Sequence, residues 1–580
     1  MTVALVLAAE ADSELRGQLT SLGVRRVDAA ERAGPGLLTV ATAAQAAGER
    51  VLICVGDDSV PEEILARLLG ADCGTVYTGL RTSGPPGGGA LVVDTPDLPA
   101  LASAAKSLAS RRVSPARLAA ARRAESAELG TLVGELARRG TSVRVLDAGP
   151  DGDGAVAQLI ADPMARNVAR WAARRQLAPA PLYGISLGFG LLAAVWFSVP
   201  AVRAQVLAIA ALLLSFLAGR AAFQLAATEW TRPAVDWLGV AAGMLTEFAV
   251  YAALAVSSGL AAQASAGTVG LNGIFGDSLP KSLAASWGGA GQIGVWRLAV
   301  AAMVLLSARR LAEVCYEDLA RASGKILPRP ARRLPGQVIT LPAGERIVVI
   351  AVTAVFFGPR LTFLVLLAWG AVAAGYVLAG QLAGAVKLAS AGQLARARGV
   401  LTAYRGDGAL AHWIGGVVRG QLPPLPPLLV GLLVTCDLAF LGIANLPGLL
   451  VLGPVAAMLL AALGACHPHN GRLDWLVPSL LLAGEGIFLT GLGFARHVWL
   501  PMIFALLAAV AVRHADIAYR ARSAKGVPDD KYGLGWDGRM LVAGFAAVFG
   551  FVPFAYAALA AWLWLLAAWD FLGSWLKTAN

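Results

Sequence analysis

Charged residues and paired cysteines are scarce in this sequence, and each shortage excludes a class of protein. Only 15% of the 580 residues are charged, whereas a soluble protein carries about a quarter. None of the five cysteines stands in a Cys-x-x-Cys pair, so we interpret them as small apolar residues of a reducing compartment. The chain therefore has neither the composition of a soluble enzyme nor the cysteine pattern of a secreted disulfide scaffold.

Apolar residues take the place of the missing charges. They make up 57% of the chain, and its mean hydropathy is +0.65. Because a membrane span needs about 20 apolar residues, a chain of 580 residues can hold a soluble domain and many spans. The N-terminal segment 1–15 has neither a basic region nor a long apolar run, so we expect no cleaved signal peptide and a cytosolic N-terminus.

The net charge of +11 raises the question of nucleic-acid binding. No basic stretch is interleaved with aromatic residues, which is the pattern expected of a nucleic-acid surface. Cytoplasmic loops of membrane proteins collect Lys and Arg, and this explains the charge. We therefore expect the lipid bilayer as a partner and no nucleic acid.

Residues 1–160 alternate between β-rich runs and helical stretches. This alternation predicts a cytoplasmic α/β domain with a parallel sheet covered by helices. Helices are expected at Pro61–Leu69 and Leu98–Leu108, and a Pro/Gly loop at 85–89. The expected strands are Val3–Leu7, Val51–Val55, Ala90–Val93 and Ser142–Leu146.

A basic amphipathic segment at 161–181 precedes the apolar part of the chain. Arg166, Arg170 and Arg174 share one helical face because four residues separate each from the next. Two interpretations stay open. The segment is either a helix in the membrane interface, with Trp171 on its apolar side, or the positively charged flank of the first span.

Twelve apolar segments follow. They predict two six-helix units, at 182–386 and 423–580, with a polar linker at 387–422. The expected fold class is an α-helical polytopic membrane protein of about 12 spans with an N-terminal α/β domain. The expected spans are 182–199, 204–225, 235–258, 294–316, 345–358, 361–384, 425–443, 447–465, 475–494, 498–518, 539–553 and 555–574.

Basic clusters set the expected orientation. With twelve spans they all lie on the side of the N-terminus, whereas the opposite loop at about 259–292 contains only Asp277 and Lys281 as charged residues. The positive-inside rule then places both termini in the cytoplasm, and we expect a multi-pass protein of the plasma (inner) membrane. The clusters lie at 166–175, 309–333, 387–405 and 513–531.

The two units share sequence features in the same order, which predicts an internal duplication. Asp-Trp-Leu opens both 236–247 and 474–485, and a glutamate closes both. Two further pairs of segments correspond in the same way, 310–316 with 513–519 and 344–349 with 537–542. Two such units could pack about a pseudo-two-fold axis, with parallel topology because six is an even number of spans.

The arginines of 166–175 and the segments Trp237-Leu238 and Glu247–Ala252 carry a family resemblance. Over about 163–386 the chain resembles the CDP-alcohol phosphatidyltransferases, integral enzymes that join a CDP-activated lipid to a polar alcohol. Their pattern is D-x2-D-G-x2-A-R-x8-G-x3-D-x3-D. Its four aspartates bind divalent metal at the CDP pyrophosphate, and the last is thought to deprotonate the acceptor hydroxyl. The resemblance also implies a homodimer.

The catalytic residues of that pattern are missing here. No aspartate occurs from 163 to 235, and without clustered carboxylates no Mg²⁺ site neutralises the pyrophosphate leaving group. We therefore expect no cofactor, with Mg²⁺ only if an active site survives. Aligned on Trp237, the aspartate positions hold Ala218, Ala221, Gly239 and Gly243, and the arginine position holds Ala226.

Other ionisable residues near the spans are the remaining site candidates, because charges in such places are often functional. The simpler interpretation makes them helix caps and interface residues, and we favour it. The segment 470–545, which contains several of them, resembles an uncharacterised domain that accompanies such transferases in actinobacterial proteins. Catalytic candidates are Glu247, Glu313, Glu485 and Asp516, and phosphate-binding candidates are Arg166, Arg170, Arg309, Arg310, Arg346 and Arg539.

The run Leu7–Glu14 and the dipeptide Gly56-Asp57 resemble parts of the sugar-phosphate nucleotidyltransferases. Those enzymes open with L-A-A-G-x-G-x-R, a turn whose backbone amides bind nucleotide phosphates. Acidic residues replace both glycines and the arginine here, and they would repel phosphate. Asp57 could be a surviving metal ligand, although a simple turn aspartate is the more common case.

Three functions follow from these patterns. The first is a non-catalytic scaffold or regulatory partner of an active phosphatidyltransferase or nucleotidyltransferase in phospholipid or polyol-phosphate lipid synthesis. The second is an active membrane transferase with a relocated polar site, for which several carboxylates should converge within about 4–6 Å. The third, a transporter or lipid-binding protein, ranks last because the spans lack a charged pair at mid-membrane.

Overall fold

The computed structural model describes most of the chain from residue 154 onward and separate segments before it. The described residues are 2–7, 19–20, 24, 26–29, 33–55, 76–80, 89–93, 98, 143–145, 154–175, 177–228, 233–264, 292–322, 338–388, 401–418, 421–441, 452–467, 469, 471–522 and 531–579.

The N-terminal segments form one six-stranded sheet, in the order β2-β1-β3-β5-β4-β6. Helix α2 (Ala33–Ala47) packs on β1 and β3. Val51, Leu52 and Ile53 of β3 are all fully buried, as expected of a strand whose two faces are both covered. The strands are β1 (Thr2–Leu7), β2 (Arg26–Ala29), β3 (Arg50–Val55), β4 (Val76–Leu80), β5 (Gly89–Val93) and β6 (Val143–Val145).

The prediction of a parallel sheet is wrong, because β5 runs antiparallel to both β3 and β4. The connection between β4 and β5 is only 81–88, and a parallel crossover needs about a dozen residues or more. The four expected strands match β1, β3, β5 and β6, whereas β2 and β4 were not predicted. The helix expected at Pro61–Leu69, and all but the first residue of the one at Leu98–Leu108, lie outside the described residues.

Within the described residues, seven helices are long and apolar enough to cross a membrane, which is compatible with a multi-pass membrane protein. Each matches one of the twelve expected spans. They are α8 (Pro179–Phe197), α9 (Val202–Thr228), α10 (Pro233–Ala264), α16 (Pro359–Leu388), α21 (Val477–Ala495), α22 (Leu500–Arg522) and α24 (Val552–Ala579).

The other five expected spans are also helical where described, but they differ from the seven in length or charge. Helix α13 (Gln292–Ala322) has 31 residues and contains several charged side chains, among them Arg309 and Arg310. The remaining helices are shorter than a typical span of about 20 residues: α15 (Ala343–Phe357), α19 (Leu425–Leu441), α20 (Gly453–Leu459) with η5 (Leu460–Gly464), and α23 (Gly535–Phe549).

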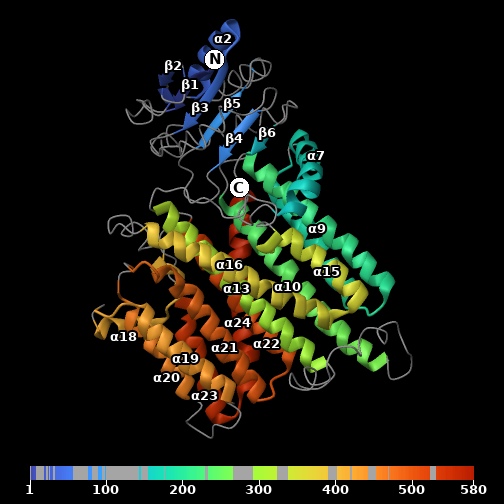
Figure 1. The fold of residues 1–580 in the computed structure, drawn as a ribbon, viewed down its shortest axis with the longest axis vertical. Coiled ribbons are helices and arrows are strands. Elements are labelled where there is room, and N and C mark those ends of the chain that lie inside the picture. The colour runs from blue at the N-terminus through green and yellow to red at the C-terminus, as the bar shows by residue number, and fades with distance from the viewer. Residues whose placement is uncertain are drawn as a thin grey trace. The chain divides into compact units, whose positions relative to one another are not determined.

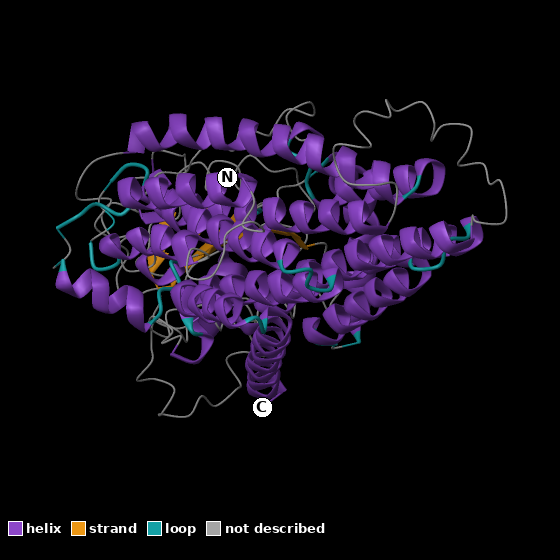
Figure 2. Ribbon diagram, turned by 90° about the horizontal axis from the view of Figure 1, so that it is seen from below, coloured by secondary structure: helices purple, strands orange, loops and turns teal. Residues whose placement is uncertain are grey.

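Figure 1 labels the helices and strands along the chain, which divides into two compact units. The first comprises Met1–Ser186 and Ser215–Val240, and so contains the sheet, the π-helical turn η2 (Ala157–Ala161) and helix α7 (Asp162–Arg174). The second comprises Leu187–Leu214 and Ala241–Asn580. Its described regular structure is helical (purple in Figure 2), whereas all described strands (orange) belong to the first unit.

Helices α13 and α22 lie at the centre of the second unit. Each packs on a later helix of its own half, α13 on α16 and α22 on α24, and the two also pack on each other. Helix α22 is the most buried of the seven apolar helices, whereas α16 and α24 are among the least buried. The apolar side chains of these outer helices are therefore the ones available to lipid.

Candidate functional site

Glu247 of α10 is the centre of a polar cluster between three helices. Arg310 of α13 donates from Nη2 to Glu247 Oε2 at 2.8 Å. Nε of Arg346, on α15, lies 2.9 Å from Glu247 Oε1, and Tyr251, one turn along α10, donates its hydroxyl to the same oxygen at 3.0 Å. We call these four residues the first cluster. Its charged side chains are partly accessible, with Arg310 at 22% and Glu247 at 12%.

A second ion pair lies beside the first cluster. Arg309 donates from Nε to Glu313 Oε1 at 2.8 Å, one turn along α13. Its Nη2 also donates to the carbonyl of Thr340 at 2.6 Å. Arg309 therefore ties the segment just before α15 to α13, while Glu313 orients Arg309 from α13 itself.

Glu485 of α21 is the centre of the second cluster, which also contains His514 of α22 and Arg539 of α23. Arg539 binds the carboxylate in a bidentate manner, with Nε to Oε1 at 2.6 Å and Nη2 to Oε2 at 2.9 Å. His514 Nε2 lies 3.5 Å from Glu485 Oε2. All three side chains are at most 2% exposed, so this cluster is closed to solvent.

The two clusters occupy corresponding places in the predicted repeat. In each, a glutamate on one helix binds an arginine near the start of a 15-residue helix. Arg346 also donates to the carbonyl of Leu341, and Arg539 to that of Gly533. Five residues before each arginine stands a leucine with positive φ, Leu341 at 47° and Leu534 at 62°. The helices end at glycines with φ of 83° and 81°, Gly358 and Gly550.

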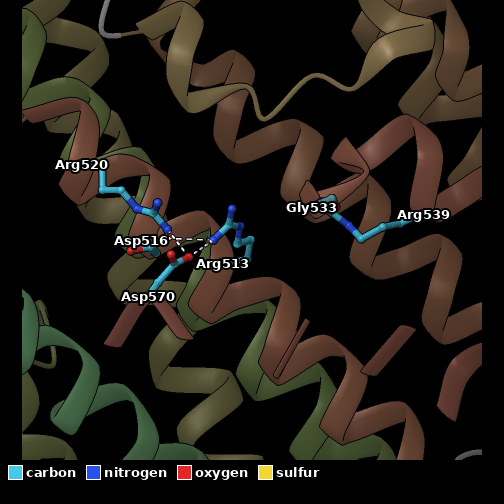
Figure 3. Close-up of polar contacts among 6 residues, drawn as sticks. All are labelled: Arg513, Asp516, Arg520, Gly533, Arg539 and Asp570. Atoms are coloured by element: carbon cyan, nitrogen blue, oxygen red, sulfur yellow. Dashed lines mark hydrogen bonds and ion pairs between the residues drawn. The ribbon is translucent and has the colours of Figure 1, made fainter. Parts of the chain in front are cut away.

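An arginine–aspartate cluster joins the end of α22 to α24 (Figure 3). Arg513 Nη1 donates to Asp516 Oδ2 at 3.1 Å and to Asp570 Oδ2 at 2.6 Å. Arg520 Nη2 binds the same two carboxylate oxygens. Two positive and two negative charges thus neutralise one another. In the same view, Arg539 lies apart from this cluster and points to the carbonyl of Gly533.

The turn at 404–408 is fixed to the start of α23. Arg405, which is fully buried, donates from Nε to Asp407 Oδ2 at 2.6 Å, and Trp536 Nε1 donates to Asp407 Oδ1 at 2.8 Å. Asp537 accepts from the amides of Gly408 and Ala411 at 2.6 and 2.9 Å. It thereby caps the N-terminus of α18 (Ala409–Val417).

Two groups near this turn have shifted pKa values. Burial raises the pKa of the Asp537 carboxyl, and the amide hydrogen bonds from Ala411 and Gly408 oppose that shift. Burial, reinforced by the positive charge of Arg405, lowers the pKa of His469 to about 3. Neither ring nitrogen of His469 has a hydrogen-bond partner within the described part of the chain. The imidazole is therefore neutral at physiological pH.

The positions aligned with the transferase motif hold no polar group. Ala218 and Ala221 lie on α9 and Gly239 and Gly243 on α10, whereas the side chain of Ala226 lies outside the described residues. A Cβ at Gly239 would lie 2.8 Å from the Tyr183 ring of α8 and 2.9 Å from its hydroxyl. Tyr183 therefore occupies the space that an aspartate at position 239 would need.

One ion pair of the first unit was not predicted. Arg220 of α9 binds Asp162 of α7 through Nε at 2.8 Å and Nη2 at 2.9 Å. Gln224, one turn further along α9, donates to Asp162 at 3.3 Å. Asp162 lies one residue before the aspartate-free segment 163–235. Its role, an ion pair between α7 and α9, becomes visible only when its distant partner Arg220 is located.

For three predicted site residues, the side chain lies outside the described part of the chain. Arg166 and Arg170 lie on α7, but their side chains are outside the described residues, and so is Asp57. The strands β1 and β3 pair in parallel and end together at Leu7 and Val55. Leu7 and Val55 therefore lie at the same edge of the sheet.

The clusters offer little to a metal or a reaction. Across the described ranges, no group of three His, Cys, Asp or Glu side chains could hold a metal ion. Glu247, Glu313, Glu485 and Asp516 each bind an arginine instead. Among the described carboxylates, Asp516 and Asp570 lie together, and two arginines neutralise that pair.

Comparison with known proteins assigns one part of the chain. Residues 395–578 match the model of a family of unknown function, DUF5941. This match covers the second cluster, the arginine–aspartate cluster and the 404–408 turn. No curated protein matches the chain.

Proposed function

We propose that this protein is a non-catalytic membrane relative of the CDP-alcohol phosphatidyltransferases, which acts as a scaffold or regulatory partner in lipid synthesis. The observation that carries the proposal is the pairing of every candidate catalytic carboxylate with arginine. A carboxylate bound by guanidinium groups has lost the lone pairs that a divalent cation would use.

The contact between Gly239 and Tyr183 supports the same proposal. In the resembled family this position carries an aspartate. Here a side chain at position 239 would have to displace the ring of Tyr183, which is buried. Loss of the metal site is therefore built into the packing of α8 against α10, and reversion of a single residue would not restore it.

The same proposal includes the placement in the membrane. We propose a multi-pass protein of the plasma (inner) membrane, with about 12 membrane segments and both termini in the cytoplasm. The positive-inside distribution supports this orientation. Labelling of single cysteines in intact and opened cells tests it: a cysteine introduced at 1–10 or 575–580 should react with an impermeant maleimide only after opening.

An assay of CMP release tests the loss of catalysis. The full-length chain in lipid nanodiscs is given CDP-diacylglycerol, Mg²⁺ and candidate polar alcohols, with Glu247→Gln and Asp516→Asn as matched variants. We expect the unmodified chain and both variants to release CMP at the same background rate. Turnover in the unmodified chain that either variant abolishes would refute the proposal.

Affinity purification from native membranes tests the scaffold function. The expected result is enrichment of a phosphatidyltransferase or a nucleotidyltransferase over a control purification with an unrelated multi-pass protein. Equal recovery of such enzymes in both purifications would count against a scaffold.

A relocated active site is the second candidate, and one observation favours it. Arg310 in the first cluster is 22% exposed, whereas the second cluster is closed. An accessible guanidinium can bind phosphate. The CMP assay also decides this case, because an active site at the first cluster would lose its turnover in Glu247→Gln.

A further inference from the structure

The two halves of the second compact unit meet along α13. Trp296 of α13 packs edge-to-face on Phe504 of α22, with ring centroids 5.7 Å apart. Further along, Tyr316 packs on Trp475 of η6 (Asp474–Leu476) at 5.2 Å. Arg297, near the start of α13, lies over the ring of Phe494 of α21 at 5.1 Å. These contacts extend over most of the length of α13.

We call this contact surface between α13 and the second half the seam. It also brings two helix backbones close together. A Cβ at Gly486 of α21 would lie 3.2 Å from both methyl carbons of Val304 of α13 and 3.8 Å from its Cβ. Small residues at such points let membrane helices pack closely. At the end of α13, Tyr404 donates its hydroxyl to Asp318. The seam is therefore packed in its middle and joined by a hydrogen bond at its end.

The helices on the two sides of the seam correspond to each other in the repeat. The first set is α10, α13, α15 and α16, and the second set is α21, α22, α23 and α24. They share the glutamate–arginine pair, the leucine of positive φ and the 15-residue helix that ends at a glycine. Helices α13 and α22 correspond and also contact each other. A helix that packs on its own equivalent is typical of a two-fold interface; here the two-fold pattern is confined to α13 and α22, because the contact of α13 with α21 has no counterpart of similar extent between the described parts of α22 and α10.

We infer that the second set is a partner in cis: it covers the face of α13 that would otherwise receive a second copy of the same helical unit. The chain is thus a fused pseudo-dimer, monomeric at this interface, and the segment that matches DUF5941 supplies the second protomer. The homodimer that the family resemblance implied is then replaced, at this face, by an intrachain contact. This inference does not depend on the loss of catalysis, so either can fail without the other.

A designed disulfide tests the inference in the full-length chain. The Cβ–Cβ distance of 3.8 Å between positions 304 and 486 lies within the disulfide range of about 3.5–4.5 Å. The double variant Val304→Cys/Gly486→Cys is made in a background without the five native cysteines, in membranes from cells that express ¹⁴N- and ¹⁵N-labelled chains together. We expect cross-linked peptides of ¹⁴N–¹⁴N and ¹⁵N–¹⁵N type only, and a chain of monomer size on a non-reducing gel.

Two outcomes would overturn the inference. Mixed ¹⁴N–¹⁵N peptides would show that α13 packs on α21 of another chain. Absence of the cross-link in a protein that folds and reaches the membrane would show that the seam does not form. The single variants, and Val372→Cys on the lipid-facing side of α16, where residue 372 is 63% exposed, are the controls for random collision between chains. Native mass spectrometry of the unmodified chain in nanodiscs should give the mass of one chain, and a stable dimer that Gly486→Leu leaves intact would place the dimer interface elsewhere.

Discussion

The first and second clusters have the same glutamate–arginine pair but different surroundings. In the first, Glu247 binds two arginines and a tyrosine hydroxyl and stays 12% exposed. In the second, Glu485 binds one arginine and a histidine, and its side chain is fully buried. The comparison teaches that the same glutamate–arginine pair forms an accessible polar site in one half of the helical part and a buried structural link in the other.

Truncation of the two glutamates should produce the largest difference between the clusters in the free energy of unfolding. Glu485→Ala leaves Arg539 charged in a closed site, so we expect a loss of about 3–5 kcal/mol in the free energy of unfolding. Glu247→Ala leaves arginines that water can reach, and we expect a loss of about 1.5–3 kcal/mol. Unfolding of both variants in the same detergent measures the difference.

The double variant Glu485→Leu/Arg539→Met is the control for this experiment. It removes both charges and should recover most of the lost stability, because well-packed apolar residues can replace a buried ion pair. A loss in Glu247→Ala as large as that in Glu485→Ala would show that the two sites are equally desolvated.

The paired leucines of positive φ differ in the opposite direction to the clusters. Leu341 is 2% exposed and Leu534 is 40% exposed. Glycine relieves the left-handed backbone at either position, but only Leu341→Gly removes a buried side chain. We expect Leu341→Gly to lower the free energy of unfolding by about 2 kcal/mol, and Leu534→Gly to change it by less than about 1 kcal/mol. Equal effects in thermal unfolding would contradict the assigned burial.

The second half should also be the more sensitive to acid, because it contains His469, which burial keeps neutral. The pKa of His469 is about 3 in the folded chain and near 6.5 when unfolded. Between these values the unfolded state binds a proton that the folded state does not, so stability is complete above pH 6.5 and falls as the pH falls.

The expected slope for His469 is about 1.4 kcal/mol per pH unit below 6.5. His469→Gln should remove this contribution from unfolding measured between pH 7.5 and 5. An unchanged pH profile in that variant would mean that His469 is not held neutral by the fold.

The smallest expected effect concerns a contact that only the second copy has. Asp537 caps α18, whereas the corresponding residue in the first copy is Gly344. Asp537→Ala should cost about 1 kcal/mol and increase hydrogen exchange at the amides of Gly408 and Ala411. Asp537→Asn, which keeps the side-chain oxygen, is the matched control and should preserve most of the protection.

Much of the helical part could be predicted from local sequence. All seven apolar helices were expected, because a run of about 20 apolar residues can satisfy its backbone in lipid only as a helix. Arg346 and Arg539 were also candidates, but for phosphate binding and not as partners of the two glutamates. The roles of Asp162, Asp407 and Asp570 were missed because each binds a residue far away in the chain. No local sequence pattern marks such pairs.

The arrangement of the sheet was predicted less well than the helices. Alternating strands and helices predicted a parallel sheet, but the direction of β5 depends on how far the chain can reach between two strands. The eight-residue connection 81–88 could have revealed the reversal if β4 had been recognised. Strand β4 (Val-Tyr-Thr-Gly-Leu) was overlooked because it is short and contains a glycine.

The sequence by itself determined that the chain is rich in apolar helices, that its two halves share several short motifs in the same order and that the aspartates of the resembled family are absent. These properties depend on residue type and spacing along the chain. Only the tertiary structure decided that Tyr183 fills the space at Gly239, that arginines neutralise the four candidate catalytic carboxylates and that α13 packs on α22. The physical reason is that desolvation and close packing depend on neighbours from distant segments, which composition and periodicity do not specify.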